Sequence, residues 1–172
     1  NQTKLRGIYE FECISEELLM RLSIKESFYQ VCEEHGFSFP KTTTCTYENH
    51  KNLELPFDFP VIIKPSNSVA YWNCKFPHKK KVFVANTREE FDAILDAIYF
   101  SSYKDHLILQ EFIPGDDSKM RVMNCYCGKD TKVKLIALGN AVLEEHSPEG
   151  IGSYAAIING YDEKLNETMK NF

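Results

Sequence analysis

Two lysines in this sequence stand where an ammonium group could hold a phosphate. Lys64 ends the apolar run of residues 61–63, which reads as a buried strand between prolines, so its charge is expected at the rim of a sheet. Lys25 lies in the first turn of a predicted helix, where the helix dipole disfavours a cation unless an anion shares the site. Both positions indicate anion binding, and an incidental surface lysine is the alternative that each leaves open.

The residues after Lys64 are short and polar. Ser66, Asn67 and Ser68 combine small side chains with exposed backbone N–H groups, which could close over a phosphate as a flexible loop. The chain contains no G-x-x-x-x-G-K-[ST], no G-x-G-x-x-G and no G-x-S-x-G pattern. Walker-type phosphate loops, dinucleotide-binding turns and nucleophile elbows are therefore excluded.

Residues 110–117 (QEFIPGDD) join the end of a predicted strand to a tight acidic turn. Such a linker can offer one backbone C=O and one N–H to a flat base, and its acidic end can meet a ribose hydroxyl. A plain strand-to-turn junction with solvated aspartates is the simpler interpretation of this segment taken singly.

Periodicity and turn residues divide the chain into short helices and strands. Helices are predicted at about 24–35 and 88–99, with an amphipathic stretch over 15–22 and a helical stripe of Leu165, Met169 and Phe172. Strands are predicted at 60–65, 81–85, 106–112, 120–127 and 132–138, the last two joined by a hairpin at 128–131. Residues 41–52 read as a loop or an edge segment, and 144–153 as a loop. This mixture indicates an α+β fold, with a mixed or antiparallel sheet packed against helices.

Capping patterns set the predicted helix ends. Ser23 and Thr87 each begin an [ST]-x-x-E capping box, and Gly36 supplies a stop for the first of these helices. No stop follows the stripe that ends at Phe172, and the chain begins at Asn1. These ends suggest a piece of a longer protein.

Charge and cysteine content exclude several classes of protein. The 172 residues carry 20 Lys and Arg against 25 Asp and Glu, a net charge of −5 that argues against nucleic-acid binding. No apolar run approaches the roughly 20 residues that span a membrane. The six cysteines show neither C-x-x-C nor zinc-finger spacing, so they read as reduced, small hydrophobic residues of a cytoplasmic protein. The basic run 78–81 reads as a solvated loop, with a phosphate-facing patch as the alternative.

In order along the chain, these pieces resemble the ATP-grasp superfamily. The matching features are a helix that starts at a phosphate lysine (Lys25), then G-x-x-x-P-x-T at 36–42, P-x-x-x-K-P at 60–65, the small-residue loop and Q/E-x-F-I-x-G at 110–115. The resemblance covers about residues 20–160 and implies an ATP-grasp fold. It divides the chain into a helical lead-in (1–40), a small subdomain (41–112) and the start of a second subdomain (113–172).

The resemblance also implies roles for individual residues. Lys25 and Lys64 would contact the ATP phosphates, beneath a flap formed by Ser66, Asn67 and Ser68. The Glu111 carbonyl and the Ile113 N–H would read the adenine edge, with Phe112 between them and the Gln110 side chain nearby. Asp117 would hold the ribose, and the resemblance assigns no catalytic residue within the chain.

The chain departs from the family in its metal ligands. Mg²⁺ would be held by a later acidic stretch ending in E-x-N, and none occurs before Phe172. Glu144 and Glu145 are a charged pair that enters a loop and read mainly as solvated. The magnesium ligands are therefore expected outside this chain, which is not expected to catalyse turnover by itself.

The implied activity is carboxylate–amine ligation through an acyl phosphate, with ATP, a small carboxylate and an amine as partners. Residues 64–72, Phe76 and 79–81 look most like the D-aspartate-ligase-type branch, which couples amino acids for cell-wall peptides. A carbamoyl-phosphate-synthetase-like enzyme is the alternative substrate class. A non-catalytic nucleotide-binding module and a plain packing domain stay open, and the sequence is silent on oligomeric state.

Overall fold

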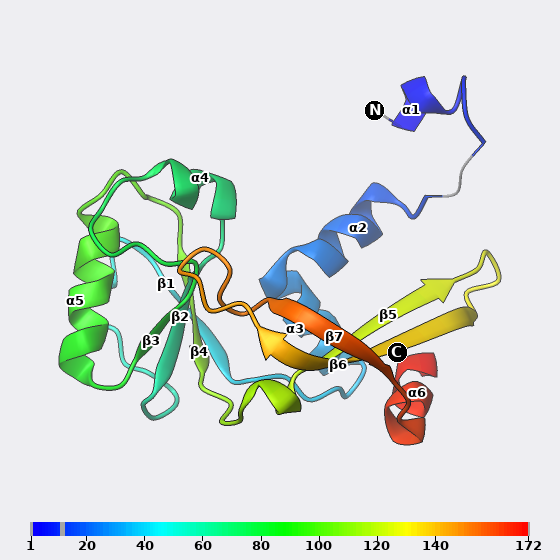
Figure 1. Ribbon diagram of the computed structural model, residues 1–172. Coiled ribbons are helices and arrows are strands. Elements are labelled where there is room, and N and C mark those ends of the chain that lie inside the picture. The colour runs from blue at the N-terminus through cyan, green and yellow to red at the C-terminus, as the bar shows by residue number, and fades with distance from the viewer. Residues whose placement is uncertain (1, 11–12, 172) are drawn as a thin grey trace. The chain divides into compact units, whose positions relative to one another are not determined.

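The computed structural model describes residues 2–10 and 13–171. The chain divides into two units, residues 1–39 and 40–172, which are described separately. The first unit contains the helices α1 (Gln2–Leu5), α2 (Glu16–Ser23) and α3 (Lys25–Glu34) (Figure 1). The amphipathic stretch and the first predicted helix are thus both confirmed as helices.

The sequence predicted the end of α3 correctly but not its start. Ser23 is the last residue of α2, and Ile24 stands at the N-cap without a side-chain bond, so the predicted capping box at Ser23 is wrong. A capping side chain needs an extended backbone, which a helical Ser23 does not have. At the other end Gly36 has a φ of 71°, and the Phe37 N–H donates to the Cys32 carbonyl at 2.8 Å. The predicted stop at Gly36 is confirmed, because these are the features of a Schellman motif.

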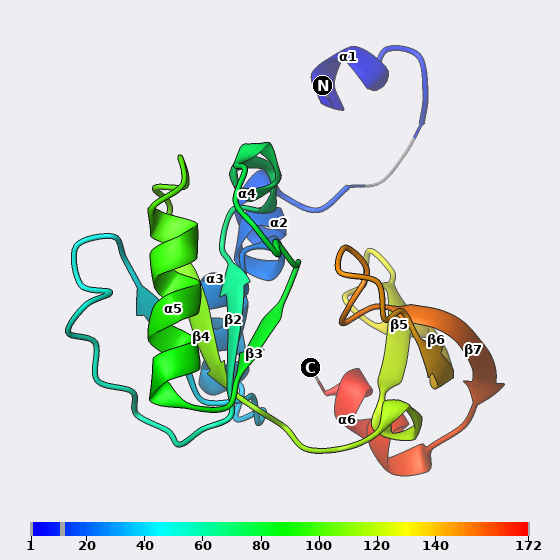
Figure 2. The ribbon, with the colours of Figure 1, turned by 60° about the vertical axis from the view of Figure 1, so that its left-hand side comes forward.

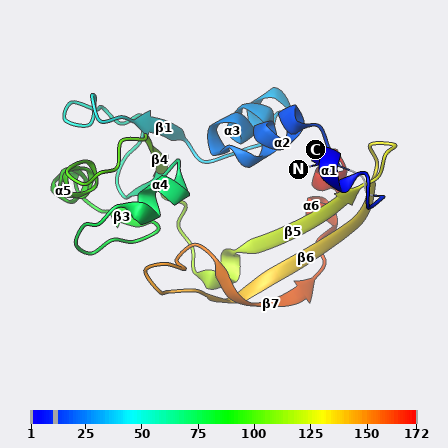
Figure 3. The same cartoon turned by 90° about the horizontal axis from the view of Figure 1, so that it is seen from above.

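Residues 40–172 contain two antiparallel sheets (Figures 1 and 3). The first, sheet A, has the order β1-β4-β2-β3. Its strands are β1 (Thr42–Cys45), β2 (Val61–Pro65), β3 (Phe83–Ala85) and β4 (Leu107–Glu111). The three predicted strands in this region are confirmed with narrower bounds, and the polar run after Pro40 supplies the edge strand β1.

One face of sheet A packs on α5 (Arg88–Tyr99), which runs along the sheet (Figure 2). The two elements share a buried cluster that includes Val61, Ile63, Leu109, Phe91 and Leu95. Alternate residues of a strand point to opposite faces, so Ile62 and Lys64 of β2 lie on the other side. The sheet therefore has one apolar face and one face that can carry polar groups.

The predicted helix at 88–99 is confirmed with the same bounds. The Thr87 side chain accepts from the Glu90 N–H at 3.3 Å, as a capping residue should. The Glu90 carboxylate in turn accepts from the Asn86 N–H at 2.7 Å, and this bond lowers the pKa of Glu90. The two side chains fix the start of α5 between them.

The second sheet, sheet B, has the order β5-β6-β7 (Figure 3). Its strands are β5 (Arg121–Cys127), β6 (Val133–Glu144) and β7 (Tyr154–Gly160), and the 3₁₀ turn η1 (Asp117–Lys119) precedes them. The hairpin at 128–131 is confirmed, but β6 ends at Glu144 rather than 138, and β7 was not predicted. Register shifts between Ala141 and Glu144 break the alternation that would have marked the longer pairing.

Helix α6 (Glu163–Lys170) follows sheet B. It contains Leu165 and Met169 of the predicted stripe, and the Asn171 N–H after it bonds to the Thr168 carbonyl at 3.1 Å. Phe172, which the stripe included, lies outside the described residues. In the described ranges no helix is both long and apolar enough to cross a membrane.

All six cysteines are free, but they fall into two groups. Cys32, Cys45 and Cys74 are buried, as expected of small hydrophobic residues, and burial raises the pKa of the Cys45 thiol to about 11. The remaining three are exposed: Cys13, Cys125 and Cys127. All six are free, as predicted, but the interpretation of the cysteines as small hydrophobic residues does not explain this exposed group, of which Cys125 and Cys127 lie on the edge strand β5.

Unfolding experiments can test whether Thr87 caps a helix and Ser23 does not. We expect Thr87→Ala to lower the free energy of unfolding by about 1 kcal/mol, because it leaves a helix N–H without its cap. Thr87→Ser, which keeps the hydroxyl, should restore most of the loss, and Ser23→Ala should cost nothing because Ser23 caps no helix. Urea unfolding followed by circular dichroism measures all three variants. An equal loss in Ser23→Ala and Thr87→Ala would contradict the cap assignment.

Candidate functional site

A chain of three side-chain hydrogen bonds crosses sheet A on the face away from α5. The Lys64 ammonium group donates to the Gln110 Oε1 at 2.8 Å. The Gln110 Nε2 donates to the Thr42 Oγ1 at 2.9 Å, and that hydroxyl donates to the Pro40 carbonyl at 2.8 Å. The chain therefore connects β2, β4 and β1.

Strand pairing explains why these side chains meet. Gln110 lies on β4, directly opposite Thr42 on one side and Ile62 on the other. Its side chain is only 7% exposed, and a buried amide is stable only when its polar atoms are hydrogen-bonded. The requirement to satisfy this amide fixes the position of Lys64, so the structure brings two of the predicted site residues into direct contact.

The predicted loop at 66–68 has a different conformation from the one expected. The Ser66 hydroxyl donates to the His106 carbonyl at 2.8 Å, and Asn67 caps the short helix α4 (Ser68–Asn73) by accepting from the Ala70 N–H at 3.0 Å. The open loop is therefore wrong as a conformation, because Asn is a favourable N-cap and starts a helix here. Whether these residues cover a phosphate stays a prediction.

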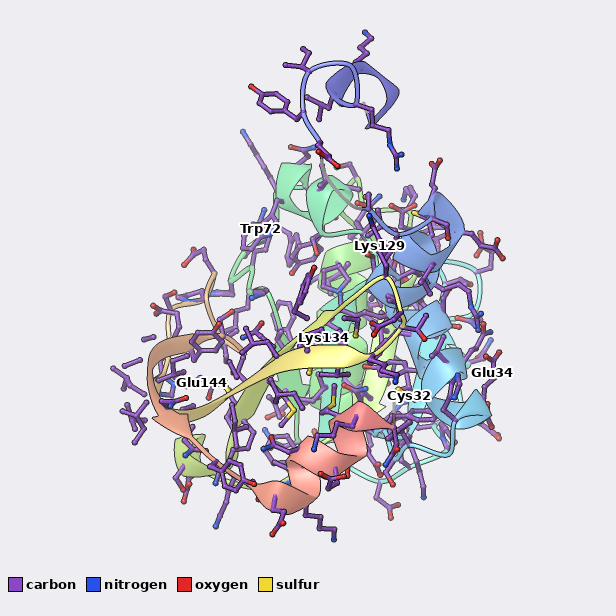
Figure 4. All side chains as sticks on the ribbon, turned by 90° about the vertical axis from the view of Figure 1, so that its right-hand side faces the viewer. Cys32, Glu34, Trp72, Lys129, Lys134 and Glu144 are labelled. Carbon is purple, nitrogen blue, oxygen red and sulfur yellow. The ribbon has the colours of Figure 1, made fainter. Side chains whose placement is uncertain are left out.

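Helix α4 is anchored by its buried tyrosine. Tyr71 is 1% exposed and its hydroxyl donates to the Lys80 carbonyl at 2.5 Å. Burial raises the pKa of Tyr71, so the hydroxyl stays protonated and able to donate. Trp72, the next residue, is partly exposed (Figure 4).

The exit of β4 carries the residues predicted to meet a base. Glu111 is held to Lys41 twice: its N–H donates to the Lys41 carbonyl at 2.9 Å, and its carboxylate accepts from the Lys41 N–H at 2.8 Å. Phe112 and Ile113 follow, 37% and 62% exposed, and offer an apolar surface. A cavity of about 540 Å³ lies beside this exit, lined by Lys41, residues 55–60, Glu111 and Phe112.

Asp117 and Lys25 lie elsewhere in the fold. Asp117 is in η1, where its Oδ2 accepts from the Glu144 N–H at 3.1 Å and lies 3.4 Å from the His146 Nε2. It is thus attached to the end of β6, at the opposite end of that strand from Lys134 (Figure 4). Lys25 is the first residue of α3, in the unit of residues 1–39.

Two residues of the site region were given no role by the sequence. Thr42 was noted only as the last letter of a motif, yet it accepts from Gln110. Lys81 was part of a basic run, yet its ammonium group donates to the Ser153 hydroxyl at 2.8 Å. Neither partner could be found from spacing, because 68 and 72 residues separate the bonded positions.

The described residues contain no ready-made group of metal ligands. Within residues 2–10 and 13–171, no group of three or more His, Cys, Asp or Glu side chains is placed to hold a metal ion. The position of the magnesium ligands, which the family resemblance places outside these residues, stays a prediction.

No family model matches the chain, but several known proteins are similar to it. A D-aspartate ligase from Enterococcus faecium (strain Aus0004) is 47% identical over 163 residues, which is 92% of this chain and 39% of that protein. The chain thus spans about two fifths of the length of this curated relative.

Solved structures share the fold at low identity. An L-amino acid ligase from Bacillus licheniformis has a TM-score of 0.58 at 12% identity, over 96% of this chain and 35% of that one. A D-alanine–D-alanine ligase from Helicobacter pylori has a TM-score of 0.54 at 19% identity, over 88% and 45%. The α+β fold with antiparallel sheets is confirmed, and at 47% identity this chain is homologous to part of a D-aspartate ligase.

Proposed function

We propose that this chain is the ATP-binding portion of a D-aspartate-ligase-type enzyme that activates an amino-acid carboxylate and joins it to an amine of a cell-wall precursor. Homology to a D-aspartate ligase supports the reaction class. The main observation in support of ATP binding is the position of Lys64, whose ammonium group is hydrogen-bonded to the buried Gln110.

Lys64 is suited to hold a phosphate because its position is fixed before any ligand arrives. An ammonium group on a free side chain loses rotamer entropy when it binds, about 2 kcal/mol at most for lysine. The bond to Gln110 and the rigid strand below it reduce that loss, and a cation at this place stabilises charge on a phosphoryl group during transfer.

The proposed reaction has two steps. A carboxylate oxygen of the donor amino acid attacks the γ-phosphorus of ATP and ADP leaves, which produces an acyl phosphate. The amine nitrogen then attacks the acyl carbon, an amide bond forms, and inorganic phosphate and a proton are released. A flap over the site would keep water from the acyl phosphate in the interval between the steps.

The other predicted contacts complete the proposal. Residues 66–68 would cover the phosphates from the start of α4, and Lys25 would reach them from the lead-in of residues 1–40. The base would lie at the exit of β4, against the Glu111 carbonyl, Phe112 and the Ile113 N–H, and Asp117 would meet the ribose. Residues 41–112 would then form the small ATP-grasp subdomain, with 113–172 as the first part of the second subdomain.

A non-catalytic nucleotide-binding module would differ from a ligase in lacking magnesium ligands, and the sequence of the full-length gene tests for them. A ligase needs magnesium ligands, and the full-length gene product should therefore contain an acidic stretch ending in E-x-N after Phe172. A reading frame without this stretch would favour a nucleotide-binding module that has no activity of its own.

Nucleotide binding through Lys64 can be measured by thermal denaturation. We expect ADP or ATP to raise the melting temperature of the chain, since a ligand at 100 times its Kd adds about 2.7 kcal/mol of stability. Lys64→Met should abolish the shift because it removes the ammonium group. Lys134→Met is the matched control, since Lys134 lies on the β5–β6 hairpin and pairs with Asp130. The absence of a shift for the wild-type chain at millimolar nucleotide would contradict ATP binding.

The contribution of Gln110 as a support can be separated from that of Lys64 itself. Thr42→Val keeps the shape of the side chain and removes the acceptor of the Gln110 amide. We expect it to weaken ADP binding about 5-fold, the effect of about one hydrogen bond, with Lys64 still present. Thr44→Val on the same strand should leave the affinity unchanged, as measured by calorimetry. Equal affinities for Thr42→Val and wild type would show that the network does not support the site.

A further inference from the structure

Lys81 hydrogen-bonds the loop of residues 145–153 to the segment that precedes β3. The Lys81 N–H donates to the Pro148 carbonyl at 2.8 Å, and its ammonium group donates to the Ser153 hydroxyl, also at 2.8 Å. Since Pro148 and Ser153 lie at the middle and the end of the loop, a single lysine holds it at two points.

The loop itself is closed at its base. The Glu145 N–H donates to the Ser153 carbonyl at 2.8 Å, and the Gly150 and Ile151 N–H groups both donate to the Ser147 carbonyl, at 3.1 and 3.0 Å. A loop whose ends meet and whose amides are bonded internally moves as one body. A contact that fixes the position of Ser153 therefore fixes the position of the whole loop.

The segment around Lys81 is attached equally firmly to α4. The Tyr71 hydroxyl bonds the Lys80 carbonyl, and the Lys79 ammonium group donates to the Trp72 and Cys74 carbonyls at 3.0 and 2.7 Å. The Lys79 ammonium group also lies 4.9 Å from the centre of the Trp72 ring. Helix α4 begins at the residues proposed to cover the phosphates, so those residues and Lys81 are connected through one rigid segment.

On its other side, the loop continues into the proposed ribose contact. Glu144, which precedes it, donates its N–H to the Asp117 carboxylate at 3.1 Å. A continuous set of contacts thus runs from Asn67 through α4, Lys81 and the loop to Asp117. It joins the two ends of the proposed nucleotide site, one at the N-cap of α4 and one in η1.

Charge favours this contact. The run of residues 79–81 is three lysines, whereas the loop carries Glu145 and Glu149. The side-chain partner of Lys81 is a hydroxyl rather than a carboxylate. The contact therefore rests on the two hydrogen bonds of Lys81, and the opposite charges of the two segments add to it.

We propose that Lys81 is a positioning residue that makes the loop of residues 145–153 move together with α4, so that closure over the phosphates also sets Asp117. This inference rests on the proposed function for its nucleotide. The contact of Lys81 with this loop, here called the latch, does not, because it involves only residues of this chain.

Hydrogen exchange of the nucleotide-free chain tests the latch. In Lys81→Met the amides of Gly150 and Ile151 should exchange about 5-fold faster, the effect of one lost hydrogen bond on loop opening. Lys81→Arg, which keeps a donor, should restore slow exchange. Lys80→Met is the matched control, because Lys80 is a neighbouring lysine that contributes its carbonyl to the Tyr71 bond. Wild-type exchange in Lys81→Met would overturn the proposal.

Saturation with ADP tests the coupling. In the wild type, ADP should protect residues 66–73 and 145–153 together, and in Lys81→Met it should protect 66–73 alone. Protection of 66–73 alone in the wild type would overturn the coupling. Protection of neither segment would contradict the proposed function and the coupling that rests on it, while the nucleotide-free comparison still judges the latch.

Discussion

The candidate site depends on the hydrogen bonding of one buried amide. Gln110 stands in β4, between β1 and β2, and its side chain is bonded to Lys64 on one neighbour and Thr42 on the other. A buried amide without partners costs about 1–3 kcal/mol. The sheet must therefore keep its register for the amide to be satisfied, and the same register determines where the ammonium group of Lys64 lies.

The residues proposed to contact the nucleotide come from the regions of both sheets. Strand β4 leaves sheet A at Glu111, and the chain then reaches η1, whose Asp117 is attached to the end of β6 in sheet B. The contact of Lys81 with the loop of residues 145–153 is a second connection between the regions of the two sheets. The contacts proposed for phosphate, base and ribose would thus be positioned by a few hydrogen bonds, each with its own geometric cause.

The sequence predicted the features that local chemistry decides. Thr87 with its Glu90 located α5, and prolines on both sides of 61–63 located β2. The prediction failed where a residue had two possible roles: Ser23 could cap one helix or end another, and Asn67 could lie in a loop or start α4. Partners far apart in sequence, such as Lys81 and Ser153, depend on the pairing of whole elements and leave no local signal.

In the proposed function, Lys64 serves the activation of a carboxylate by ATP. Trapping of the acyl phosphate with hydroxylamine in the full-length gene product tests it most directly, because the hydroxamate reports the first step without the natural amine. We expect the wild type to form hydroxamate from D-aspartate when ATP is present, Lys64→Met to lose this activity and Lys134→Met to keep it. Hydroxamate formation by Lys64→Met at the wild-type rate would show that Lys64 does not serve this step.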